Sequence, residues 1–127
     1  MNKTIINSSN APAPIGPYSQ AVQAGGFLFL SGQIALKPGT SDLVSGNITE
    51  ETAQVMKNLQ AVLTEAGLNF SDVVKTTIFL KEMSFFAEVN AEYGRYFDKD
   101  FPARETVAVK TLPKDVNVEI SMIAVIG

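Results

Sequence analysis

Only two segments of this chain have the apolar spacing of an amphipathic helix, while most of the remainder alternates apolar and polar residues. We predict the order strand, hairpin, helix, strand, helix, hairpin, in one domain over residues 1–127. Two helices can cover only one face of the resulting sheet. The other face carries too many apolar groups to remain in water, so we expect another copy of the chain to cover it.

The first strands are predicted to surround a glycine turn. Residues 3–7 are expected to form an edge strand, and residues 8–17 a loop, because proline and glycine interrupt any helical period there. Gly25-Gly26 then separates two alternating segments, and both glycines tolerate the positive φ of a two-residue hairpin. Symmetric pairing about this turn places Gln20 opposite Ser31.

The first helix has recognisable ends. Thr49 is its predicted N-cap, two glutamates follow in the first turn, and Gly67 ends the helix in a Schellman-type cap. Its apolar stripe consists of Val55, Met56, Leu59, Val62, Leu63 and Ala66.

A strand and a second helix follow. Residues 73–81 are predicted to form the strand, and one of its faces carries Val74, Thr76, Ile78 and Leu80. Ser84 is the predicted cap of the second helix, which runs to about Phe97. Its stripe consists of Phe86, Val89, Tyr93, Tyr96 and Phe97. Asn90 falls inside this stripe, where a polar side chain needs a partner.

The last quarter of the chain is predicted to form a β-hairpin. Residues 101–109 and 116–126 both alternate, and Pro113-Lys114-Asp115 supplies the turn between them. Symmetric pairing gathers the polar groups on one face, namely Arg104, Thr106, Glu119 and Ser121. The other face, expected under the helices, carries Val107, Val109, Val118, Ile120 and Met122. In this register Arg104 and Glu119 lie about 13 Å apart, so they either bracket a ligand or act from different subunits.

Composition restricts the chemistry. The chain has neither cysteine nor histidine, which excludes disulfides, thiolate nucleophiles, cysteine-held zinc and Ser-His-Asp triads. A net charge of −3 argues against a nucleic-acid footprint. No apolar run approaches the roughly 20 residues of a membrane span, and the N-terminus lacks a signal-peptide pattern. We therefore expect a cytoplasmic protein that binds neither nucleic acid nor membrane.

Two charged strand residues are the leading site candidates. The planar fork of Arg104 matches a carboxylate, although a surface salt bridge is the ordinary alternative. Glu119 stands between two apolar strand residues. It is either an interfacial carboxylate or a group that holds and deprotonates water, with burial raising its pKa.

Other candidates are weaker when taken singly. Tyr18 is either a core aromatic residue or a phenol that lines a pocket. Ser31-Gly32 is plain strand, or else a hydroxyl beside a backbone N–H that a ligand can approach. Asn90 is either a polar clip between elements or a pocket residue. Thr106 alone says little, because threonine is common in strands.

Five separated blocks occur in one order and spacing. They are Ala-Pro-Ile-Gly-Pro-Tyr-Ser-Gln (13–20), Ser-Gly-Gln-Ile (31–34), Val-Asn-Ala-Glu-Tyr (89–93), Phe-Pro-Ala-Arg (101–104), and Leu-Pro-Lys-Asp-Val with Val-Glu-Ile (112–120). Together they closely resemble the Rid (YjgF-like) family, specifically its RidA branch of enamine/imine deaminases. The likeness covers essentially the whole chain.

The resemblance implies an α+β, chorismate-mutase-like fold with a mixed sheet and two helices on one face. It also implies a homotrimer with sites between subunits. The implied reaction is hydrolysis of 2-enamine or 2-imine acids, derived from 2-aminoacrylate or 2-aminocrotonate, to 2-oxo acids and ammonia. No cofactor or metal is implied.

The resemblance also assigns roles to individual residues. Arg104 would clamp the substrate carboxylate and Glu119 would position the attacking water. The pocket would be lined by Tyr18, Ser31, Gly32, Asn90 and Thr106. Many relatives carry cysteine where this chain has Thr106, so a thiol role is impossible here. The alternatives are a regulator that binds a 2-oxo acid without turnover, a ribonuclease or translation inhibitor, and a purely structural oligomer.

Overall fold

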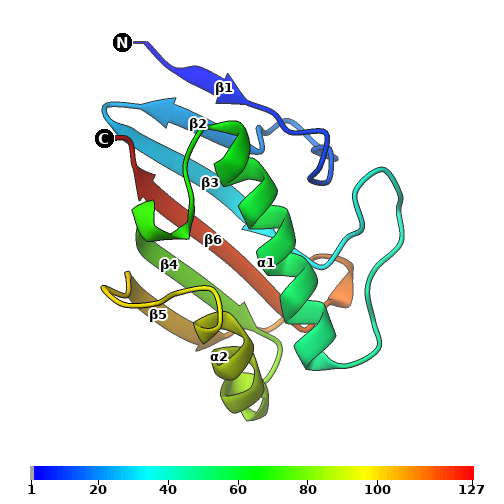
Figure 1. Ribbon diagram of the computed structural model, residues 1–127. Helices are drawn as coiled ribbons and strands as arrows, with labels where there is room; N and C mark the ends of the chain where they lie inside the picture. The colour runs from blue at the N-terminus through cyan, green and yellow to red at the C-terminus, as the bar shows by residue number, and fades with distance from the viewer. Residues whose placement is uncertain (1) are drawn as a thin grey trace.

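The computed structural model describes residues 2–127, in which two α-helices pack on one face of a six-stranded sheet (Figure 1). The main elements are β1 (Thr4–Ile6), β2 (Ala21–Ala24), β3 (Phe27–Gln33), α1 (Ile48–Glu65), β4 (Val73–Leu80), α2 (Phe86–Gly94), β5 (Ala103–Ala108) and β6 (Val118–Val125). Single 3-10 turns precede β4, α2 and β6, namely η1 (Phe70–Asp72), η2 (Met83–Phe85) and η3 (Pro113–Asp115). The strand order is β1-β2-β3-β6-β4-β5.

The N-terminal half folds as the sequence predicts. Gly25 and Gly26 have φ values of 60° and 84°, and Ala24 pairs with Phe27 across this turn. The backbone N–H of Ser31 donates to the carbonyl of Gln20, in agreement with the predicted facing. β1 pairs with β2 and forms one edge of the sheet, so the predicted edge strand and hairpin are both confirmed.

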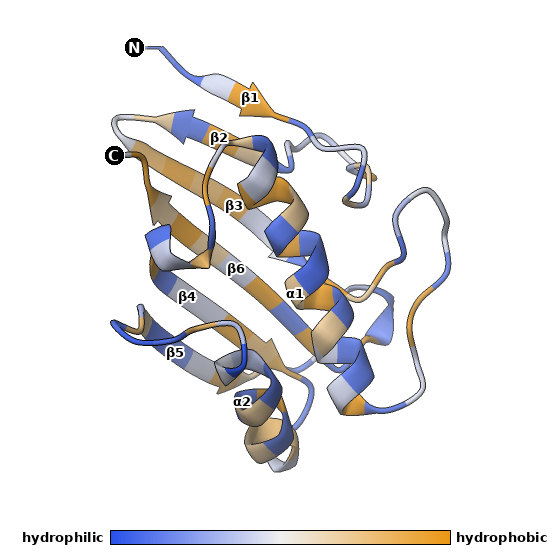
Figure 2. Ribbon diagram, viewed as in Figure 1, coloured by the Kyte–Doolittle hydropathy of each residue, from blue (hydrophilic) through white to orange (hydrophobic). Residues whose placement is uncertain are grey.

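Helix α1 is confirmed, but it begins earlier than predicted. Asn47, not Thr49, is the N-cap, because its side-chain oxygen accepts a hydrogen bond from the Glu50 backbone N–H at 2.8 Å. At the other end Gly67 has a φ of 77°, and the Leu68 N–H reaches back to the Leu63 carbonyl as in a Schellman motif. The apolar stripe of α1 is buried on the sheet, and Figure 2 shows apolar segments along β3 and β6 behind it.

Helix α2 is shorter than predicted. Ser84 does not cap it, because the chain first makes the η2 turn and the N-cap residue Phe85 makes no side-chain capping bond. The helix ends at Gly94, and the next residues continue in tight turns that bring the rings of Tyr96 and Phe97 onto Phe70. The prediction that Asn90 lies within the buried stripe is wrong, because its side chain is exposed.

The predicted C-terminal hairpin is wrong. β5 pairs only with β4, in parallel, whereas β6 lies between β3 and β4 and is antiparallel to both. The physical reason is α2. A helix that joins two strands normally returns the chain parallel to the first strand, so β4, α2 and β5 form a crossover unit. The turn at residues 113–115 then carries the chain past β4 to the centre of the sheet.

The two faces of the sheet differ in cover. In the β6 strand, Val118, Ile120 and Met122 are buried under the helices, as predicted. The uncovered side, which we call the open face, carries the side chains between them. Its apolar members include Phe27, Phe29, Phe79, Val107, Ile123 and Val125. The prediction that Val107 lies on the covered face is wrong, because Val107 pairs with Phe79 on the open face. The predicted facing at the start of β4 is also wrong there, because a register shift exposes Val74 and buries Val73.

Candidate functional site

Arg104 and Glu119 project from opposite faces of the sheet. Arg104 pairs with Thr76, which is fully buried on the helix side, so the Arg104 side chain points toward α2. Glu119 lies between the buried residues Val118 and Ile120, so its side chain points to the open face. The prediction that both share one face is wrong, because it assumed that β5 and β6 are paired.

Arg104 lies in a hollow of about 360 Å³, which we call the cationic half-site. Its lining comes from α2 and from the segment that enters β5, and consists of Asn90, Tyr93, Gly94, Phe101, Pro102 and Arg104. Within residues 2–127 the ion pairs are Lys75–Glu105, Lys81–Asp115 and Arg95–Glu92. Arg104 thus has no carboxylate partner in the described chain, and the salt-bridge alternative for it is wrong.

Thr106 follows Arg104 on the same face of β5. It pairs with the buried Ile78, so it also points toward the helix side. Its hydroxyl oxygen is buried and makes no hydrogen bond within residues 2–127. A buried hydroxyl without a partner is unfavourable, and Thr106 is not among the residues that line the cationic half-site.

Four other predicted residues meet on the far side of the sheet, in a hollow of about 390 Å³ that we call the acidic half-site. They are Tyr18, Ser31, Gly32 and Glu119, and the remaining lining residues are Ile15, Ile34 and Pro113. Burial raises the pKa of the Glu119 carboxyl above its ordinary value. Tyr18 is half exposed, so the alternative that it is a core aromatic residue is wrong.

The loop that carries Tyr18 is held by one buried amide. The Gln20 side chain accepts from the Ser8 backbone N–H at 2.6 Å and donates to the carbonyls of Ser8 at 3.0 Å and Pro12 at 2.9 Å. The Ser31 hydroxyl donates to the Ser19 carbonyl at 2.6 Å, so its proton is engaged while its oxygen can still accept. These bonds fix one wall of the acidic half-site.

The turn that supplies Pro113 is also held from a distance. Lys114 and Asp115 both have a φ of 55°, a conformation that L residues rarely adopt. The buried carboxylate of Glu51, in the first turn of α1, accepts from the backbone N–H and the side-chain amide of Asn117, both at 2.8 Å. Sequence reasoning placed Glu51 only as a helix-end charge, because nothing in the local pattern pairs it with a residue so far along the chain.

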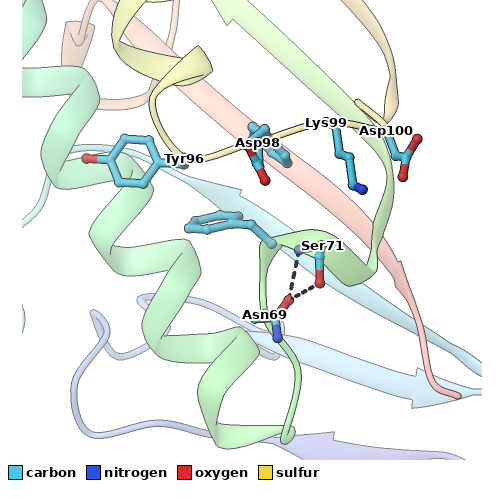
Figure 3. Close-up of a pocket in the computed structure, with 8 residues that line it drawn as sticks. Asn69, Ser71, Tyr96, Asp98, Lys99 and Asp100 are labelled. Atoms are coloured by element: carbon cyan, nitrogen blue, oxygen red, sulfur yellow. Dashed lines mark hydrogen bonds between the residues drawn. The ribbon is translucent and has the colours of Figure 1, made fainter.

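A further hollow lies between η1 and the segment after α2 (Figure 3). The figure shows Asn69 and Ser71 bonded to each other on one side and Tyr96, Asp98, Lys99 and Asp100 on the other. None of the predicted site residues line it. In the described chain no cluster of acidic residues is arranged to hold a metal ion, and neither α-helix has the length and apolarity of a membrane span.

Known proteins are similar to this chain over almost its whole length. The family model described as Endoribonuclease L-PSP matches residues 8–126. A RutC family protein of Synechocystis is 55% identical over 128 residues, covering 99% of this chain and 98% of that protein. A mouse 2-iminobutanoate/2-iminopropanoate deaminase is 46% identical over 125 residues, covering 98% of this chain and 93% of the mouse protein.

A solved structure shares the fold of this chain. The crystal structure of E. coli TdcF with bound serine superposes with a TM-score of 0.91 at 38% identity, covering 96% of this chain and 98% of TdcF. The expected architecture, two helices on one face of a mixed six-stranded sheet, is therefore confirmed.

Proposed function

Because this chain belongs to the Rid (YjgF-like) family, whose model is described as Endoribonuclease L-PSP, we propose that it is an enamine/imine deaminase. Its substrates are the 2-imino acids derived from 2-aminoacrylate and 2-aminocrotonate, and its products are 2-oxo acids and ammonia. The mouse relative with that activity in its name supports the proposal. The bound serine of E. coli TdcF supports a site for a small molecule with a carboxylate.

The observation that carries the proposal is the separation of the site into two halves. A small imino acid cannot contact Arg104 and Glu119 of one subunit when they face opposite sides of the sheet. In a cyclic homotrimer, the cationic half-site of one subunit would meet the acidic half-site of the next. The exposed apolar residues of the open face support such an assembly, because a contiguous apolar surface is normally covered.

The chemistry needs only the groups that these halves supply. Arg104 would bind the substrate carboxylate bidentately and orient the C2 carbon. Water adds to C2 of the protonated imine, and Glu119 accepts the proton that the water loses. The same carboxyl then returns that proton to the amine. As the C–N bond breaks, the carboxylate takes the remaining proton from the C2 hydroxyl and passes it to the departing ammonia, so a 2-oxo acid and an ammonium ion are formed. A protonated imine is already electrophilic, so no histidine or nucleophilic thiol is required.

Subunit complementation tests this proposal. Arg104→Ala and Glu119→Gln proteins are each assayed for 2-oxo acid release with a serine/threonine dehydratase as imine source, then co-refolded in equal amounts and assayed again. If each site takes its halves from two subunits, random pairing restores about one quarter of the parent activity. A mixture that stays as inactive as its two components contradicts shared sites, and an inactive parent protein contradicts the deaminase itself.

A carboxylate-binding regulator is the second candidate. The bound serine of TdcF favours it, since occupancy of a site does not require turnover. The two candidates differ in the assay above, because a regulator binds 2-oxobutyrate yet leaves the rate of ketoacid release unchanged. A ribonuclease role finds less support, because the chain has a net charge of −3 and no histidine.

A further inference from the structure

We propose that Phe86 and Tyr93 are positioning residues that hold the Arg104 guanidinium by their ring faces, in the place that a carboxylate partner normally takes. The charge of Arg104 is thereby kept in place without being neutralised, ready for the carboxylate of a ligand. That the ligand is a 2-imino or 2-oxo acid rests on the proposed function. The pair of rings formed by Phe86 and Tyr93, which we call the aromatic seat, rests on the geometry of this chain alone.

The two rings lie on one side of α2. They are seven residues apart, which is about two helical turns, so both face β5. The Cζ atom of Arg104 lies 5.1 Å from the centre of the Tyr93 ring and 5.7 Å from that of Phe86. Both distances are within the range of a cation–π interaction.

The aromatic seat explains how the Arg104 cation can be partly buried without a carboxylate partner. Arg104 is half buried in the cationic half-site and lacks a carboxylate partner in the described chain. A permanent carboxylate would compensate the lost hydration, but it would also occupy the N–H donors and compete with a ligand. An aromatic ring attracts the cation through its negative face and leaves the donors at the guanidinium edge free.

Tyr93 is the fixed member of the pair. Its side chain is 4% exposed, and its hydroxyl donates to Thr76 Oγ1 at 2.9 Å. Burial raises the pKa of this phenol, which keeps it neutral beside the cation. Thr76 is also the residue that pairs with Arg104 across β4 and β5, so one position anchors both the ring and the strand that carries the arginine.

Phe86 is the member that core packing does not explain. It is the first residue of α2 and 37% exposed, so much of its ring remains accessible to water. A phenylalanine kept for the core would be expected to be more deeply buried. Leucine at this position should therefore fold normally while removing the ring, which makes Phe86 the better residue to test.

The experiment uses the two arginines of the chain as probe and reference. Arg95 and Arg104 are its only arginines, so the Nε–Hε region of a ¹⁵N spectrum contains two side-chain signals. Arg95 is 74% exposed and paired with Glu92, and it serves as the internal reference. The assembled protein is titrated with 2-oxobutyrate, and the dissociation constant, KM and kcat are measured for each variant.

We expect Phe86→Leu to shift the Arg104 signal toward that of Arg95 and to weaken 2-oxobutyrate binding roughly two- to fivefold, as expected for an exposed cation–π contact. KM should rise by a similar factor with little change in kcat. Phe86→Tyr, which restores a ring, should return both signal and affinity to those of the parent. Tyr93→Phe retains its ring but loses the hydrogen bond to Thr76 Oγ1, so it should lower stability while affecting affinity less than Phe86→Leu does.

Phe70→Leu is the matched control. It removes a buried ring that packs on Tyr96 and Phe97 and is not one of the two rings at the Arg104 cation, so it should lower stability without moving the Arg104 signal. An unmoved Arg104 signal and unchanged affinity in Phe86→Leu would overturn the aromatic seat. A protein that never turns over imines but shows the expected signal shifts would overturn the proposed function alone.

Discussion

Gly32 and Glu119 compete for the same space on the open face, since a Cβ at position 32 would lie 2.9 Å from the Glu119 carboxyl carbon. Gly32→Ala should therefore swing the carboxylate away from its place in the acidic half-site. Because that carboxylate ends a flexible side chain, we expect little loss of stability but a fall in kcat of about tenfold to a hundredfold.

Gly46→Ala is the matched control for this substitution. There the new methyl group would displace the carboxylate of Glu50, which is exposed and outside both half-sites. Urea denaturation and the dehydratase-coupled assay should show both variants folded and only the Gly32 variant impaired. Equal activity of the two would remove Gly32 from the site.

Arg104→Lys keeps a positive charge but loses the bidentate fork. We expect kcat/KM to fall about 10- to 100-fold, since a hydrogen bond to a charged group contributes about 1.5–3 kcal/mol. Arg95→Ala provides the comparison, because Arg95 is exposed, pairs with Glu92 and lines neither half-site. The clamp is contradicted if the two variants have the same kcat/KM.

Thr106→Val separates stability from binding. Valine has nearly the same shape, and the hydroxyl that it removes is buried without a hydrogen-bond partner. Thermal unfolding without ligand should show the variant as stable as the parent, or more stable by about 1 kcal/mol. If the hydroxyl meets a ligand, isothermal titration with 2-oxobutyrate should show weaker binding. A destabilised variant with unchanged affinity would mean that the hydroxyl has a structural partner instead.

The titration of Glu119 should make the activity fall at acidic pH. Its pKa is raised by burial above the ordinary 4.5, and only the ionised form can take a proton from water. The logarithm of kcat should therefore fall as the pH drops through this raised value, at a higher pH than an exposed carboxylate would give. A pH–rate profile of the parent protein from pH 4 to 9 checks this.

The same shift has a consequence for folding. The folded protein binds the Glu119 proton more tightly than the unfolded chain, so this contribution to stability is full below pH 4.5 and is lost as the pH rises through the folded-state pKa. Glu119→Gln, which cannot ionise, should be more stable than the parent at pH 8, with the difference shrinking at pH 4. A difference that is the same at both values contradicts the raised pKa.

Gln20→Leu should loosen the loop that carries Tyr18. Leucine leaves the Ser8 N–H and the carbonyls of Ser8 and Pro12 without their partner in a buried place. We expect a loss of about 2–4 kcal/mol in unfolding free energy and a higher KM. Gln23→Leu, at a partly exposed position in the adjoining strand β2, should change neither by a comparable amount.

The sequence predicted elements better than it predicted neighbours. The glycine turn at Gly25-Gly26 and the stripe of α1 are local signals, so both appear in the structure as expected. Alternation in residues 101–109 and 116–126 gave two strands correctly, but alternation does not say which strand lies beside which. The signal that was missed is the order strand, helix, strand over β4, α2 and β5, which favours parallel pairing.

For the candidate site, too, the sequence predicted the residues better than their arrangement in space. Apart from Thr106, the residues that the resemblance selected do line the two hollows. The faces derived from the assumed hairpin were nevertheless wrong for Arg104 and Glu119. Residues that act at a distance, such as Gln20 and Glu51, were not selected. Their bonds join positions far apart in the chain, and only the fold brings such positions together.

The opposite orientation of Arg104 and Glu119 also bears on genetics. In a closed ring of shared sites, each copy of the chain serves two neighbours. A copy that lacks both groups therefore disables two sites at once, and a ring of three that contains it keeps only one. Damaged alleles of this kind should behave as partly dominant over the intact gene.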